Sequence, residues 1–292
     1  MEIIGKVAAI NTSDGLSNLS IVDQEGTLWN IKAPLDKIFY IGHVYIFTVK
    51  KNIGERVSYL VEGVQSVEEL PIKESDQLLR RFFPKSPYTL EESMDMVYSV
   101  IEGIGNVVIQ GITKSLLDTY QKQFFLYPAA SRMHHTYVGG LAYHTIGMIK
   151  LAKAFLENYP YLNADYLYSG IILHDLGKTK ELTGIEATEY TLDGQLLGHL
   201  VIGALEIGKT AEILGYGTTK EVQMLQHMLI SHHGQPQFGA AKRPMTPEAV
   251  ALWYIDTIDS KFRVLGEELD KTQSNHFTES IGVLDKVKIY KG

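Results

Sequence analysis

The chain has 292 residues, 45% of them hydrophobic and 21% charged, so it can bury a sizeable core and divide into two packed units. Its formal net charge of −7 argues against non-specific coating of nucleic acid, and any polyanion would need a local basic patch. Cysteine is absent, which excludes disulfides, zinc-thiolate sites and thiol nucleophiles. Neither a secretory signal nor an apolar run approaching about 18 residues is found, so we expect a soluble cytoplasmic protein without membrane partners.

Residues 1–66 predict a small β-barrel that is OB-fold-like. Short β-branched and aromatic runs at 3–10, 18–23, 27–32, 43–50 and 56–64 are bounded by turn residues, and Gly26 can take the positive φ of a hairpin turn. Five short strands in this length are typical of a closed or partly open barrel.

Such a barrel can hold single strands by stacking bases on aromatic side chains. The candidates are Trp29, Tyr45, Phe47 and Tyr59. Alternation along the strands places half of them in the core, and Trp29 is the preferred substrate-binding residue among them.

Residues 67–90 lose the apolar periodicity and carry prolines and the pair Arg80-Arg81, so we interpret them as a linker. Residues 91–292 predict an all-α domain, in which Thr246 and Pro247 are typical of an N-cap and a first helical residue. The segment 281–289 could add a strand. An apolar helical surface left over at 90–126 could serve a homo-oligomer. The expected helices span 90–103, 108–126, 139–157, 164–177, 196–214, 219–232 and 247–265.

Histidines and aspartates recur on the apolar faces of these helices. A single inward histidine is more often a hydrogen-bonded core residue than a ligand, and His43, His227 and His276 are interpreted as structural or surface residues. Several inward titratable groups on separate helices are better explained by a shared cation, because unpaired buried charges are costly. The groups are His144, His174, Asp175, His199, His232, Asp256 and Asp259.

The order His144, His174-Asp175, Asp256 resembles the H…HD…D signature of the HD superfamily. The local sequences Gly-Gly-Leu-Ala-Tyr-His at 139–144 and Ile-Leu-His-Asp-Leu-Gly-Lys at 172–178 strengthen the resemblance. Almost the full chain resembles the YhaM-type exoribonucleases, cytoplasmic enzymes in which an OB-fold precedes an HD domain. These enzymes remove nucleotides from the 3′ end of single-stranded RNA or DNA.

The resemblance implies a two-ion site. His144, His174, Asp175 and Asp256 would hold a first metal ion, with Asp175 bridging to a second. His199, His232 and His233 are similar to the further ligands of that second ion. Asp259 is interpreted as a group that orients a histidine or Lys261. A nitrogen and oxygen ligand set suits manganese, which we favour, and also iron, cobalt or nickel.

Further residues are candidates for phosphate contact. Lys178 could reach a phosphate as a point charge, although a lysine near a helix C-terminus is also favourable for dipole reasons. His134 and His135, with Arg132 nearby, could contact the scissile or an adjacent phosphate, or could only make hydrogen bonds at the helix entry. Lys261 could add local positive charge, or be a solvated surface residue.

The sequence thus predicts a metal-dependent 3′–5′ exonuclease of single-stranded RNA, and the resemblance leaves activity on single-stranded DNA open. Two alternatives stay open: a phosphohydrolase of small or cyclic nucleotides, and a non-catalytic single-strand-binding or replication-associated protein with a structural metal cluster. Preference for mononucleotides would identify the first alternative. Tight single-strand binding without turnover under any divalent metal would identify the second.

Overall fold

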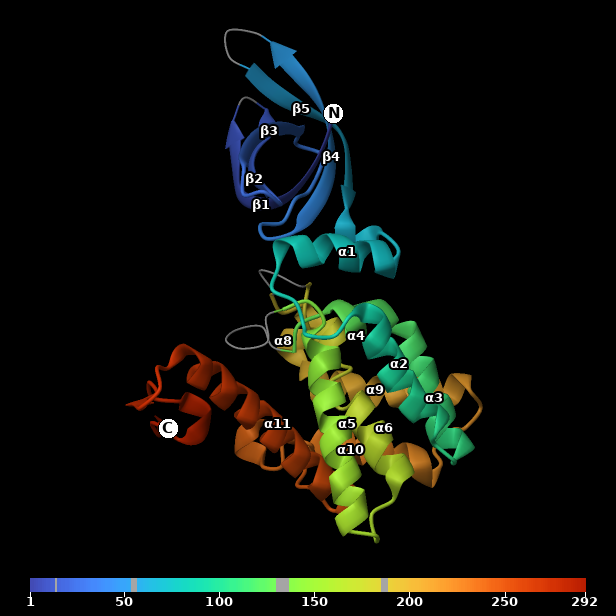
Figure 1. Cartoon of the computed structure of the whole chain (residues 1–292). Coiled ribbons are helices and arrows are strands. Elements are labelled where there is room, and N and C mark those ends of the chain that lie inside the picture. Colours follow the sequence, from blue (N-terminus) through green and yellow to red (C-terminus); the bar gives the residue numbers. More distant parts are fainter. Residues whose placement is uncertain (14, 54–56, 130–136, 185–188) are drawn as a thin grey trace. The chain divides into compact units, whose positions relative to one another are not determined.

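The computed structural model describes residues 1–13, 15–53, 57–129, 137–184 and 189–292, and the chain divides into two compact units. The first unit comprises residues 1–90, 126–140 and 183–189, and the second comprises 91–125, 141–182 and 190–292. Figure 1 shows a β-barrel in the first unit and a set of packed helices in the second. Within the described ranges, every helix is too short or too polar to cross a membrane.

The first unit contains a closed barrel in the strand order β1-β2-β3-β5-β4, with β4 pairing back to β1. Every neighbouring pair is antiparallel except β3 with β5. Leu19, Ile21, Ile31 and Phe47 fill the interior, which confirms the predicted small barrel. The strands are β1 (Glu2–Ser13), β2 (Leu16–Asp23), β3 (Leu28–Pro34), β4 (Val44–Ile53) and β5 (Val57–Ser66).

The β1–β2 hairpin is longer than predicted. Its ladder continues through Asn11↔Asn18 to Ser13↔Leu16, beyond the last β1 residue that the apolar pattern marked. Main-chain hydrogen bonds extend a strand pair without burying side chains, so an apolar pattern cannot locate that end. Gly26 has the expected positive φ, at 81°.

The barrel aromatics divide as alternation predicts. Tyr45 and Phe47 are buried in the core, whereas Trp29 and Tyr59 are half-buried and meet edge to face with ring centroids 5.5 Å apart. The Trp29 indole N–H donates to Asp23 Oδ2 over 2.8 Å. Trp29 packs against the core cluster rather than standing free, and its role in stacking bases stays a prediction.

The segment interpreted as a linker contains a helix, α1 (Ile72–Phe82), after the 3-10 turn η1 (Val67–Glu69). Its buried residues include Ser75 and Asp76, and Asp76 pairs with Arg80 at 2.6 Å. The Ser75 hydroxyl donates to the Val67 carbonyl over 2.7 Å. Ile72, Leu79 and Phe82 do recur at helical spacing, but apolar residues are few and polar side chains complete the buried face, so the charged segment resembled a linker.

The second unit is helical, as predicted. The expected helix at 108–126 is divided at Tyr120, and the one at 164–177 ends at Leu173. The helices are α2 (Leu90–Glu102), α3 (Val107–Thr119), α4 (Gln121–Leu126), α5 (Gly140–Asn158), α6 (Ala164–Leu173), α7 (Lys178–Glu181), α8 (Leu192–Leu196), α9 (Gly198–Ile213), α10 (Lys220–Ser231), η2 (Pro236–Phe238) and α11 (Pro247–Lys271).

The extra strand expected at 281–289 is wrong. This segment holds the 3-10 turn η3 (Gly282–Leu284), and the strands β6 (His276–Phe277) and β7 (Tyr290–Lys291) pair on either side of it. Asp285 and Lys286 have φ of 56° and 63°, a left-handed conformation that no β-strand continues through.

A core cluster forms where α5, α6, α10 and α11 pack, and close helix contacts depend on small residues. A Cβ at Gly170 would lie 2.2 Å from Met228 Cε, and one at Gly203 would lie 2.8 Å from Leu229 Cδ2, so α10 approaches both helices closely. Ile112, Leu117 and other apolar residues of 90–126 are buried in this unit. Val107 in the same range is exposed, and a homo-oligomer stays a prediction.

Helix α11 begins as predicted, because Thr246 accepts a hydrogen bond from Ala249 N and Pro247 occupies the first turn. We expect Thr246→Ala to destabilise the protein by about 1 kcal/mol, since it leaves an N–H of the first turn without its acceptor. Urea unfolding measures the loss. Thr246→Ser keeps the hydroxyl and should stay near wild type, and equal stability of both variants would contradict the role of the cap.

Candidate metal centre

Helices of the second unit bring all seven predicted ligands to one place. His144 lies on α5, His199 on the first turn of α9, and Asp256 on α11. The pairs His174-Asp175 and His232-His233 directly follow α6 and α10. Two groups have ligand atoms close enough to hold a metal ion, all within 4.8 Å of one another. The first cluster is His144, His174 and Asp256, and the second cluster is His199, His232 and His233.

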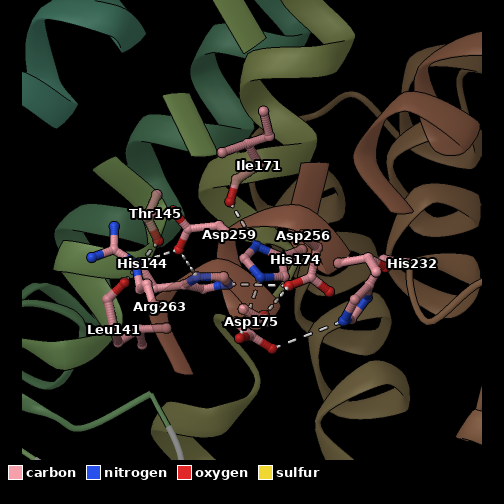
Figure 2. A network of polar contacts seen from close by, with 12 residues as sticks. Leu141, His144, Thr145, Ile171, His174, Asp175, His232, Asp256, Asp259 and Arg263 are labelled. Atoms are coloured by element: carbon pink, nitrogen blue, oxygen red, sulfur yellow. Dashed lines mark hydrogen bonds and ion pairs between the residues drawn. The ribbon is translucent and has the colours of Figure 1, made fainter. Parts of the chain in front are cut away.

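Asp175 lies between the two clusters. Its Oδ2 is 3.2 Å from His174 Nε2 of the first cluster, and its Oδ1 is 3.4 Å from His199 Nε2 and 3.9 Å from His232 Nε2 of the second. Figure 2 shows this carboxylate with His174 and His232 turned toward it. One carboxylate therefore faces both groups of imidazoles, one oxygen to each.

The two histidines that follow helices are anchored on main-chain carbonyls. His174 Nδ1 lies 2.7 Å from Ile171 O, and His232 Nδ1 lies 2.7 Å from Leu229 O. Carbonyl oxygens of a last helical turn lack partners in the helix itself, and each ring satisfies one of them. Because a carbonyl can only accept, Nδ1 carries the hydrogen in both rings and Nε2 of the neutral ring keeps its lone pair.

The other three histidines are anchored in the same way on different acceptors. His144 Nδ1 is 2.7 Å from Asp259 Oδ2, His199 Nδ1 is 3.1 Å from Glu181 Oε1, and His233 Nδ1 is 2.8 Å from Phe238 O. Arg263 pairs with Asp259 from one turn further along α11 (Figure 2). All five rings of the clusters thus direct Nε2 away from their anchors.

The Nε2 atoms show that this ligand set fits a cation. Those of His174, His199 and His232 are buried and make no hydrogen bond within the described residues, although Asp175 is near all three. Buried polar atoms normally find partners, and an unmade hydrogen bond costs about 1–3 kcal/mol. These nitrogens carry no hydrogen that could be donated to Asp175. Their lone pairs converge beside its carboxylate, an arrangement that suits a shared metal ion.

The protonation states agree with this interpretation. Burial raises the pKa of Asp175, but the charge of Lys178 and the contacts of His174 outweigh burial and hold that pKa well below its usual range. Burial is the largest cause that lowers the pKa of His232 well below its usual range. The carboxylate is therefore ionised and this imidazole neutral at pH 7, the forms that bind metals.

His144 differs. Burial lowers its pKa, but hydrogen bonds and charges of Asp256 and Asp259 outweigh burial and raise the pKa to about 9. Its Nε2 lies 3.2 Å from Asp256 Oδ1, so this pair shares a proton when no metal is bound. A cation that binds the first cluster would displace that proton, which makes binding weaker at low pH.

Lys178 lies beside the clusters, with Nζ 2.7 Å from Asp175 Oδ2. Burial lowers the pKa of Lys178, but Asp175 outweighs burial and raises it, so the ammonium stays charged. Lys178 is the first residue of α7, which has a single turn and begins five residues after α6 ends at Leu173. Its contact with a phosphate stays a prediction.

The remaining candidates are placed differently. Arg132, His134 and His135 lie outside the described residues. Lys261 is five residues after Asp256 on α11, about 140° around the helix at 100° per residue, and makes no polar contact with either cluster in the described structure. Asp259 orients a histidine as expected, and that histidine is His144.

Sequence reasoning missed Glu181 and Arg263. Arg263 follows Asp259 by four residues on one helix, a spacing that pairs opposite charges and was available in the sequence. Glu181 meets His199 only because α7 packs on the start of α9, a contact that no local pattern predicts.

Comparison with known proteins agrees with the geometry. The model of the HD domain family matches residues 141–261, a range that contains both clusters and Asp175. The fold and site therefore define an HD-domain protein.

The chain is 39% identical over 271 residues to the 3′-5′ exoribonuclease YhaM of Geobacillus sp. (strain WCH70), covering 92% of this chain and 82% of that protein. It is 40% identical to the protein of the same name from Bacillus licheniformis, covering 92% and 84%. The chain belongs to the YhaM family of 3′-5′ exoribonucleases. No solved structure matches it.

Removing divalent cations should destabilise the protein, because three buried Nε2 atoms would then lack a partner. A ligand present at 100 times its Kd stabilises by about 2.7 kcal/mol, which corresponds to a fall in Tm of about 5–10 °C on chelation. Differential scanning calorimetry with and without EDTA measures it. The double variant His174→Ala/His232→Ala should respond far less to EDTA, and an unchanged wild-type Tm would contradict metal binding here.

Gly177, which follows the His174-Asp175 pair, allows its backbone to pack directly against the first turn of α9. A Cβ at this position would lie 2.1 Å from the His199 carbonyl oxygen. We expect Gly177→Ala to cost about 1–3 kcal/mol through overpacking. Gly266→Ala on α11 is the matched control, because its Cβ meets nothing within 4 Å and alanine favours the helix. Equal unfolding free energies for the two variants would argue against a backbone contact at Gly177.

Proposed function

We propose that this protein is a metal-dependent 3′–5′ exoribonuclease that hydrolyses single-stranded RNA from its 3′ end. The observation that carries the proposal is the pair of histidine clusters joined by Asp175 within an HD domain. The similarity to proteins named 3′-5′ exoribonuclease, over 92% of this chain, supports the same direction and substrate. The proposed substrate would also place the protein in the cytoplasm.

In this proposal His144, His174, Asp175 and Asp256 hold one ion, and Asp175 with the second cluster holds another. Manganese is the preferred ion, and iron, cobalt or nickel suit the same nitrogen and oxygen donors. Divalent cations in such a pair lower the pKa of water and offset negative charge on a phosphodiester. No side chain needs to act as a nucleophile.

The protein residues bind and orient the substrate. The Lys178 ammonium lies 2.7 Å from Asp175 Oδ2 and would attract a phosphate oxygen next to the clusters. The chain's net charge of −7 makes such local cations important for a polyanionic substrate. His134 and His135 are proposed catalytic contacts to the phosphate. Arg132, Lys261 and Trp29 are proposed substrate contacts, and a homo-oligomer is compatible with these roles.

Single-stranded RNA labelled at either end tests the direction and the chemistry together. With Mn²⁺, a 5′ label should give products that shorten progressively, and a 3′ label should be released at once as a mononucleotide. Asp175→Asn should lower the rate by at least about 100-fold, since it removes the charge that faces both clusters. Product gels and kcat/KM report the result.

Asp270→Asn is the matched control, because Asp270 is an exposed residue near the end of α11. It should degrade RNA at the wild-type rate. Intact RNA with several divalent metals, together with turnover of free or cyclic nucleotides, would replace this proposal with a small-nucleotide phosphohydrolase. Tight binding to RNA without turnover of any substrate would replace it with a binding protein.

A further inference from the structure

We propose that Glu181 is the positioning residue of the second cluster, and that its hydrogen bonds to His199 decide whether a cation binds there. Asp259 would have the same relation to His144 in the first cluster. The two ions would then be controlled separately, by two different buried carboxylates. This inference rests on the proposed two-ion site and does not depend on the substrate.

The first argument is the double contact of one oxygen. Glu181 Oε1 accepts from the His199 main-chain N–H over 3.0 Å and lies 3.1 Å from His199 Nδ1. Glu181 is 7% exposed, so these hydrogen bonds are shielded from water. A single atom thus fixes the backbone of His199 and the rotation of its ring, and the ring then presents Nε2 to the second cluster.

The second argument is the way α9 begins. The N-cap of this helix is Leu197, whose side chain has no acceptor, so the first N–H groups need partners from elsewhere. Glu181 on α7 supplies an acceptor for one of these N–H groups, that of His199, although it is not the N-cap residue of α9. Removing its carboxylate would loosen the first turn of α9, which is the turn that carries His199.

The third argument is that close packing fixes the backbone on both sides of this hydrogen bond. A Cβ at Gly177 would lie 2.1 Å from the His199 carbonyl oxygen, and one at Gly194 would lie 2.4 Å from the Glu181 carbonyl oxygen. The Glu181 carbonyl also accepts from Thr191 N over 2.9 Å. The backbones of α7, α8 and α9 therefore meet without intervening side chains, and hold both partners of the hydrogen bond.

The anchors of the other rings identify the matched comparison. His174, His232 and His233 are anchored on main-chain carbonyls, which substitution cannot remove. Each cluster therefore contains one ring whose anchor is a carboxylate: His144 with Asp259, and His199 with Glu181. A partner behind a metal-binding histidine typically changes metal affinity by about 10–100-fold.

The experiment titrates Mn²⁺ alone into metal-free full-length protein by calorimetry, with the bound metal counted by elemental analysis. The wild type should bind two ions per chain. Glu181→Ala should weaken one ion by about 10–100-fold and leave the other unchanged. Glu181→Gln keeps an acceptor oxygen and should recover most of the loss. Glu212→Gln, on the exposed side of α9, should behave as wild type.

A double-mutant cycle assigns the affected ion. In a His199→Ala background, Glu181→Ala should cause no further loss of Mn²⁺ affinity. In a His144→Ala background, it should cause the same loss as in the wild type. The inference is overturned if Glu181→Ala binds both ions normally, if it loses both together, or if the wild type binds fewer than two. If the wild type binds two ions and Glu181→Ala loses one, but RNA is not degraded, the proposed function fails while this inference holds.

Discussion

The hydrogen bond at Nδ1 is the constraint on which the site depends. A neutral imidazole has one donor and one acceptor nitrogen, and an acceptor at Nδ1 leaves the lone pair on Nε2. In both clusters every ring has such an acceptor, whether a carbonyl or a carboxylate. The five rings are therefore fixed in one direction by hydrogen bonds at the nitrogen that faces away from the site.

Helix ends provide two of these acceptors. The last turn of a helix has free carbonyls, and a histidine placed just after it can turn back to one of them. His174 after α6 and His232 after α10 do so with the same i−3 spacing. The acidic partner Asp175 then follows in sequence, so one helix end contributes both an imidazole and a carboxylate. Close packing at Gly170 and Gly203 brings these ends together.

Much of this could be predicted from the sequence. The barrel followed from alternation and turns, and the helices from apolar spacing. The gathering of the seven candidate ligands followed from a motif whose order is fixed by the fold. Helix α1 was missed because Ser75 and Asp76 are buried polar residues, and the false strand at 281–289 arose because positive φ at Asp285 and Lys286 has no apolar signature. Glu181 was missed because long-range contacts depend on how helices pack.

The carbonyl anchors of His174 and His232 have a consequence for how the protein acquires its metal. Since both rings are oriented by their own helices, these parts of the site can form as soon as α6 and α10 are folded. A metal ion could then be captured from the surroundings after folding. Nitrogen and oxygen donors bind the later first-row metals more tightly than manganese, so affinity alone would not select manganese. The relative supply of the metals would then determine which ion the protein carries.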